Sequence, residues 1–132
     1  MDVQLITLPK FEDVTGNVAV IEKDCIPFDI KRVFYLYDIT GTSKRGRHAH
    51  KQLIQFLIPI SGSFDVIVKD GSNEQLYTLT EPNVGLLVKE GIWNELLNFS
   101  PGAVCMVIAS DVYNEDDYIR DYSDYLAYVN KM

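Results

Sequence analysis

The sequence predicts an all-β protein, an antiparallel β-barrel or jelly roll that carries one short C-terminal helix. Eight short runs are rich in β-branched and aromatic residues, which are the residue types that strands favour. Clusters of glycine, proline, asparagine and serine separate many of these runs and mark turns. Short strands interrupted this often are typical of a sandwich or barrel. Beyond residue 114 the apolar residues change to a helical spacing, which predicts the single helix.

The predicted strands occupy the chain up to residue 109. They cover residues 18–21, 30–38, 52–60, 64–69, 75–79, 84–88, 93–99 and 104–109. The predicted helix spans residues 115–130, since Asn114 is a suitable N-cap and the three acidic residues after it favour a helix N-terminus. Its apolar residues recur on one face, so we expect one amphipathic helix lying on the barrel.

The composition favours one globular domain and disfavours several classes of function. With 132 residues, 47% of them apolar, the chain can bury a core, and we expect a single domain over residues 1–132. A net charge of −7 without a basic run disfavours a nucleic-acid partner, and an anionic ligand would need a locally basic pocket. The sequence shows neither a leader nor a long apolar run, so we expect a cytoplasmic protein without a membrane partner. Cys25 and Cys105 match no metal-binding spacing and are expected to be reduced thiols without a role.

The segment Arg45-Gly46-Arg47-His48-Ala49-His50 holds both histidines of the chain. Side chains alternate along a strand with a period of two, so His48 and His50 are expected to point to the same face. In a closed β-structure that face lines a cavity, where two imidazoles suit proton transfer or metal binding. The alternative is a pair of surface or core histidines, which the neighbouring arginines make less attractive because they suit an anionic ligand.

The spacing around the histidines matches the first motif of the cupin barrels. Four residues separate His50 from Gln55 and six more lead to Gly62, with glutamine where the motif carries an acid. The second motif is degenerate, because Gly85 and Gly91 are not followed by a histidine. Two of the four usual ligands are therefore present, and we expect a cupin without a metal or another cofactor.

Several blocks, in the right order, resemble the TDP-4-keto-6-deoxyhexose 3,4-ketoisomerases, small cupins also described as WxcM-like. The blocks are residues 26–35, 45–51, 84–86, Trp93 with Glu95, 109–111 and 117–120. The resemblance implies a homodimer of antiparallel barrels that exchange their N-terminal strands. It also implies a substrate, a TDP-linked 4-keto-6-deoxyglucose, whose carbonyl moves from C4 to C3 on the way to a 3-amino sugar for a surface glycan.

Such a reaction needs a base near neutrality, and the unperturbed pKa of histidine lies there. His48 is the candidate base at carbon, and His50 either orients it or protonates a sugar oxygen. Tyr35 and Tyr37 share one face of the preceding strand and are candidates to hydrogen-bond O4, while aromatic core residues would show the same pattern.

Basic side chains are the candidates for the pyrophosphate, because guanidinium groups bind phosphate oxygens in pairs. They are Arg45, Arg32 and Lys51, of which the last two are as consistent with surface ion pairs. Trp93 is expected to stack on the thymine or to close the barrel mouth. The other residues expected at the substrate are Arg47, Gln55, Asn94 and Thr15.

Three positions depart from the relatives. The relatives tend to carry arginine or tyrosine in place of Thr15, tyrosine in place of Phe34, and histidine or arginine in place of Asn94. The loss of these polar groups motivates one alternative, a non-catalytic cupin that binds a nucleotide sugar. A second alternative is a nucleotide-sugar 3,5-epimerase, whose members share the RGxH stretch but use a further acid-base histidine. The sequence leaves the configuration of the product at C4 open.

Overall fold

The computed structural model describes residues 1–40 and 42–131. These residues form twelve strands, one short 3₁₀ turn between the last two strands, and one α-helix after the last strand. In chain order the elements are β1 (Val3–Thr7), β2 (Lys10–Asp13), β3 (Gly16–Ala19), β4 (Arg32–Leu36), β5 (Arg45–His50), β6 (Gln55–Ser61), β7 (Phe64–Lys69), β8 (Glu74–Leu79), β9 (Val84–Val88), β10 (Trp93–Leu97), β11 (Val104–Ala109), the 3₁₀ turn (Glu115–Asp117), β12 (Tyr118–Ile119) and α1 (Tyr122–Asn130).

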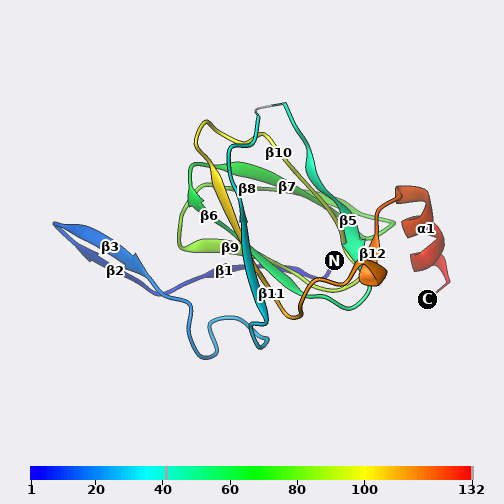
Figure 1. Ribbon diagram of the computed structural model, residues 1–132, viewed down its shortest axis with the longest axis horizontal. Coiled ribbons are helices and arrows are strands. Elements are labelled where there is room, and N and C mark those ends of the chain that lie inside the picture. Colours follow the sequence, from blue (N-terminus) through cyan, green and yellow to red (C-terminus); the bar gives the residue numbers. More distant parts are fainter. Residues whose placement is uncertain (41, 132) are drawn as a thin grey trace.

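Two five-stranded sheets form the body of the protein. Their strand orders are β1-β9-β6-β11-β4 and β12-β5-β10-β7-β8, and every pairing is antiparallel. The two sheets lie face to face and enclose the interior (Figure 1). The main apolar cluster takes side chains from both sheets, including Leu57 on β6, Val66 on β7, Leu86 on β9 and Val107 on β11. This arrangement confirms the predicted antiparallel barrel.

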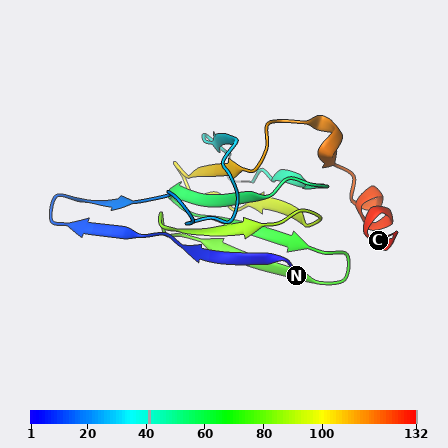
Figure 2. The same ribbon diagram turned by 90° about the horizontal axis from the view of Figure 1, so that it is seen from below.

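The hairpin of β2 and β3 projects away from the barrel (Figures 1 and 2). Its register runs from Lys10 opposite Ala19 to Asp13 opposite Gly16. Two of its apolar side chains, Phe11 and Val18, are 64% and 58% exposed. The strand predicted at residues 18–21 is thus the second arm of a hairpin, and the sequence did not predict β1 or β2.

The C-terminal segment differs from the single helix predicted at residues 115–130. Asn114 caps only the 3₁₀ turn, and the next two residues form β12, which pairs with β5. Because this pairing occupies backbone groups of Tyr118 and Ile119, the helix begins later, at Tyr122, after its own N-cap Asp121. Among the helices of the described residues, none is long and apolar enough to cross a bilayer.

Helix α1 packs against the outer face of the β5 and β10 sheet. Tyr125 is fully buried there, and its hydroxyl lies 2.7 Å from the carbonyl oxygen of Gly91 and 3.0 Å from that of Lys69. Burial raises the pKa of Tyr125 to about 12, so the hydroxyl keeps its proton and can donate to these carbonyls. The helix therefore fastens the turn before β10 to the end of β7.

Candidate active site

The two histidines lie side by side on β5 and face the interior. Their ring centroids are 4.8 Å apart with an interplanar angle of 80°, and both line a cavity of about 510 Å³. His50 is only 4% exposed. The prediction that His48 and His50 share a face is confirmed, and the cavity between the sheets is the space that they share.

A bulge in β5 sets which of its other side chains reach the cavity. On β10, Asn94 is opposite His48 and Leu96 is opposite Arg45, so β5 uses one residue more than β10 between the two pairs. Gly46 provides the extra residue with φ 61°, a left-handed conformation that favours glycine. A Cβ there would also lie 3.3 Å from Oδ1 of Asn94. The bulge brings Arg45 to the cavity together with the histidines.

The cavity is basic although the chain is acidic. Five cationic side chains line it, namely Arg32, Lys44, Arg45, Arg47 and Arg120. Arg120 is paired with Glu115 at 2.7 Å and Lys44 with Glu95 at 3.6 Å. The other three arginines form no ion pair within residues 1–40 and 42–131. Three guanidinium groups without an ion-pair partner around one cavity suit a ligand with several negative charges.

Burial and neighbouring positive charge keep both imidazoles neutral. Desolvation, His50 and Arg120 lower the pKa of His48 to about 3. Desolvation, Arg120 and Arg32 lower the pKa of His50 to about 4. The unperturbed value of about 6.5 belongs to a solvated ring, and burial moves the pKa of both histidines below it. Both rings are therefore unprotonated at neutral pH, and each has one nitrogen with a free lone pair.

Two buried amides complete the polar lining and do not make a metal site. Gln55 and Asn94 both line the cavity, and Nδ2 of Asn94 has no hydrogen-bond partner in the described part of the chain. Within that same part, no three histidine, cysteine, aspartate or glutamate side chains come together as a metal site would require. Two imidazoles with two neutral amides do not fit the ligand set that a metal-binding cupin uses.

A wall that the sequence did not predict comes from β12. The ring of Tyr118 lies edge-on to both imidazoles, 4.3 Å from His50 and 4.9 Å from His48 between centroids. The guanidinium of Arg120 lies over the ring of Tyr118, 4.2 Å from its centroid, and both residues line the cavity. Residues 117–120 stood out in the sequence as one block of the family resemblance, but their placement in a helix concealed their position beside the histidines.

The predicted substrate residues divide into two groups. The cavity brings together Arg32, Arg45, Arg47, Gln55 and Asn94 with the two histidines. Five other predicted residues do not reach it, namely Tyr35, Tyr37, Lys51, Trp93 and Thr15.

Tyr35 on β4 and Tyr37, directly after the end of β4, share a face, as expected, but it is the outer one. They are 61% and 60% exposed, and their rings lie 5.8 Å apart. Phe34 and Leu36, which alternate with them, line the cavity instead. These two candidates for the contact with O4 therefore do not line the cavity of their own chain, because the strand presents Phe34 and Leu36 to the interior.

Lys51 also lies outside the cavity, in a depression beside Asp124 and Tyr128. Thr15 is at the end of the β2–β3 hairpin, where its hydroxyl contacts Asp13 at 3.2 Å. The hairpin projects away from the barrel, so Thr15 does not approach the histidines of its own chain (Figure 2).

Trp93 is 2% exposed and packs under α1 rather than facing a ligand. Its ring meets Tyr122 edge-on at 5.1 Å, and its Nε1 donates to Oε2 of Glu95 at 2.9 Å. It neither stacks on a nucleobase nor closes the barrel mouth, because α1 buries the outer face of β10. Trp93 anchors the helix.

Comparison with known proteins identifies the family. The family model described as WxcM-like, C-terminal, matches residues 1–130. The chain belongs to the WxcM-like family. It is 44% identical, over its whole length and 96% of the relative, to the TDP-4-oxo-6-deoxy-alpha-D-glucose-3,4-oxoisomerase of Aneurinibacillus thermoaerophilus.

Solved structures agree with this membership of the WxcM-like family. A 3,4-ketoisomerase from Helicobacter canadensis superposes with a TM-score of 0.96 at 43% identity, covering 98% of both chains. A histidine-to-asparagine mutant of the 3,4-ketoisomerase from Thermoanaerobacterium thermosaccharolyticum, solved with TDP-4-keto-6-deoxyglucose, has a TM-score of 0.96 at 38% identity, covering 98% of this chain and 95% of that one. A dTDP-4-dehydrorhamnose 3,5-epimerase from Bacillus anthracis reaches 0.79 at 17% identity, over 89% of this chain and 77% of that one, and shares the fold alone.

Proposed function

We propose that this protein is an isomerase that moves the keto group of a TDP-linked 4-keto-6-deoxyhexose from C4 to C3. The observation that carries the proposal is the pair of neutral imidazoles on the wall of a basic cavity. The 44% identity to an oxoisomerase that acts between the same two carbons supports it. Imidazoles supply proton transfer, and the basic lining suits a nucleoside diphosphate.

The arginines of the cavity hold the diphosphate. Arg45 and Arg47 flank the bulge at Gly46, and Arg32 reaches the same cavity from β4. Their guanidinium groups neutralise the phosphates, and the Nδ2 of Asn94 donates to a sugar oxygen. Binding of this anion raises the pKa of both histidines from their low values in the free protein, which moves them toward the range in which acid-base catalysis is efficient.

His48 removes the proton from C3, and the electrons of that C–H bond form the C3–C4 double bond of an enediolate whose negative charge lies on O4, which then receives the proton of the C3 hydroxyl. The oxygen at C3 then becomes the new carbonyl, as His48 returns a proton to C4. His50, whose ring is next to that of His48, passes the hydroxyl proton between the two oxygens. Protons and electrons balance, so no oxidant or reductant is consumed.

The active unit is a homodimer that exchanges its N-terminal hairpins. β4 is an open edge of its sheet, and Val33 and Tyr35 on it, with Tyr37 directly after it, are exposed. The β2–β3 hairpin exposes Phe11 and Val18, so pairing it with a second copy would cover apolar surface on both partners. The exchange would also bring Thr15 near the cavity of the other chain.

Light scattering tests the dimer. Replacing Phe11 and Val18 together by aspartate should give monomers with reduced activity, because two charges would be buried at the interface. Leu76→Asp is the matched control, since Leu76 is a similarly exposed apolar residue on β8, at the edge of the other sheet. A hairpin double variant that stays dimeric and fully active would contradict the exchange.

NMR of deuterium incorporation tests the reaction. With the TDP-linked 4-keto-6-deoxyglucose in D₂O, we expect exchange at C3 and formation of the 3-keto sugar. Exchange at C5 would indicate an epimerase, and absence of exchange would indicate a protein that only binds the nucleotide sugar. The 3-keto product suits an aminotransferase that forms a 3-amino sugar for a surface glycan. Both cysteines are free thiols, which is consistent with action in the reducing cytoplasm.

A further inference from the structure

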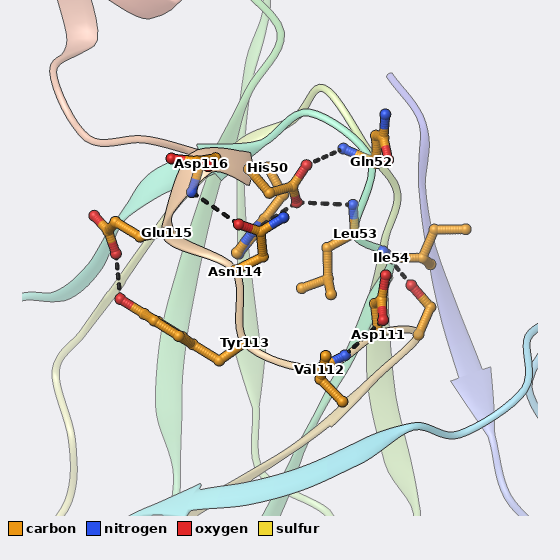
Figure 3. Close-up of polar contacts among 12 residues, drawn as sticks. His50, Gln52, Leu53, Ile54, Asp111, Val112, Tyr113, Asn114, Glu115 and Asp116 are labelled. Carbon is orange, nitrogen blue, oxygen red and sulfur yellow. Dashed lines mark hydrogen bonds and ion pairs between the residues drawn. The ribbon is translucent and has the colours of Figure 1, made fainter.

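Asp117 fastens the loop before β12 to the turn that follows His50. Its main-chain carbonyl accepts the N–H of Lys51 at 2.9 Å. Its carboxylate oxygens Oδ1 and Oδ2 accept the N–H groups of Gln52 and Leu53 at 2.8 Å and 3.1 Å. Figure 3 shows His50, Gln52 and Leu53 gathered around this loop. The three consecutive backbone N–H groups after His50 therefore all donate to Asp117.

The same carboxylate faces the ring of His50. Oδ2 of Asp117 lies 3.5 Å from Nδ1 of His50, and this nitrogen is buried and makes no hydrogen bond within the described residues. A carboxylate only accepts hydrogen bonds, so the contact is attractive when Nδ1 carries the hydrogen. The lone pair of the neutral ring then lies on Nε2, the nitrogen that is left for the cavity.

His48 differs from His50 in this respect. Within residues 1–40 and 42–131, His50 is the histidine that has a carboxylate in ion-pair range, and His48 is not. The neighbouring Tyr118 strengthens the asymmetry, because it pairs with His50 across β12 and β5 and places its ring 4.3 Å from the imidazole. The segment around β12 thus fixes the position of His50 from two sides.

We propose that Asp117 is a positioning residue that holds His50 in the tautomer with its hydrogen on Nδ1 and its Nε2 lone pair toward the substrate. In the reaction Nε2 takes the proton of one sugar hydroxyl and returns it to the adjacent oxygen, while the Nδ1 hydrogen stays on the ring. The carboxylate of Asp117, 3.5 Å from Nδ1, stabilises the imidazolium that exists between the two transfers. The kinetic part of this inference rests on the proposed isomerase function, and the tautomer is a property of the free protein.

Nitrogen-15 NMR of the histidine rings tests the proposal at neutral pH. The chain has two histidines, and His48→Asn leaves the signals of His50 alone. We expect a hydrogen on Nδ1 of His50 in the wild-type protein. In Asp117→Asn the amide presents an N–H₂ donor in place of one carboxylate oxygen, so we expect the hydrogen to move to Nε2 and kcat to fall about ten- to a hundredfold with KM retained.

Asp116→Asn is the matched control. Asp116 is the residue before Asp117 and its side chain is exposed, so the variant loses the same charge but should keep the wild-type tautomer and rate. A wild-type spectrum with the hydrogen of His50 on Nε2 would overturn the proposal, whether or not the Asp117 variant folds. So would an Asp117→Asn protein that loses activity with the tautomer unchanged, since Asp117 would then only support the turn. Absence of isomerase activity in the wild-type protein would refute the proposed function and leave the tautomer result standing.

Discussion

Mild acid should destabilise the protein through its two histidines. An unfolded histidine titrates near the ordinary pKa of 6.5, whereas burial lowers the pKa of His48 to about 3 and of His50 to about 4 in the folded protein. Between these values the unfolded chain binds protons that the folded chain does not. The stabilisation is therefore complete above the unfolded pKa and is lost as the pH falls toward the folded values.

The magnitude follows from the difference in proton binding. Going from about pH 7 to about pH 5.5, each histidine lowers the free energy of unfolding by about 1.2 kcal/mol, and the pair by about 2.5 kcal/mol. That is a large part of a typical stability of about 5–15 kcal/mol. Carboxylates add little in this window, because even Glu115, whose pKa its bonds to Arg120 and Tyr113 lower to about 2, begins from an ordinary value of 4.5.

Urea denaturation at both pH values measures the effect, at one protein concentration because assembly also stabilises. His48→Asn and His50→Asn should each remove about half of the drop, and the double variant should remove nearly all of it. The reasoning would be refuted by a wild-type protein that is equally stable at both pH values. It would also be refuted by a drop that persists in the double variant, since the responsible groups would then lie elsewhere.

Four further predictions concern catalysis. His48→Asn should lower kcat by about a hundred- to ten-thousandfold, or about 3–5 kcal/mol of barrier, with an unchanged circular dichroism spectrum; a variant within about threefold of the wild-type rate would remove His48 from the role of base. The acid limb of kcat/KM should lie well below pH 6.5, because the pKa of free His48 is about 3, and a limb at 6.5 would contradict its burial as a neutral ring. Activity should survive EDTA and dialysis, so a stoichiometric metal whose removal abolishes activity and whose return restores it would overturn the metal-free mechanism. We expect a single C4 epimer of galacto configuration, because Thr15 and Asn94 are small and neutral. The double variants Thr15→Arg with Asn94→His and Thr15→Tyr with Asn94→Arg should change the epimer ratio, measured by NMR of the products, or the rate. If both variants keep the wild-type ratio and rate, these two positions do not control the configuration at C4.

The histidine pair could be predicted from sequence because it depends on one property of a strand. The spacing of His48 and His50 gives a common face whatever surrounds the strand, and the cupin spacing to Gln55 indicates that this face is internal. The orientation of strand β4 could not be predicted in this way. Tyr35 and Phe34 are both aromatic, and the sequence does not say which face of an edge strand turns inward.

The remaining differences arise from tertiary contacts. Trp93 and Asn94 are both buried although they point to opposite faces of β10, because α1 covers the outer one. Residues 115–121 contain helix-compatible spacing, but pairing of Tyr118 with His50 gives two of them a strand conformation. Local preference competes there with an open sheet edge more than sixty residues away in the chain, which local sequence does not reveal.

The order in which the ribosome delivers these parts has a consequence for the nascent protein. β5, with both histidines, is made early, whereas Asp117, Tyr118 and Tyr125 follow every strand of the two-sheet body except β12. The hydroxyl of Tyr125 contacts the carbonyl of Gly91, whose own N–H binds the carbonyl of His50, so the helix reaches the histidine strand through the backbone. During synthesis the barrel can therefore collapse around its apolar core while the imidazoles still lack their outer wall. The wall of the histidine site is completed only when the residues beyond 114 have left the exit tunnel.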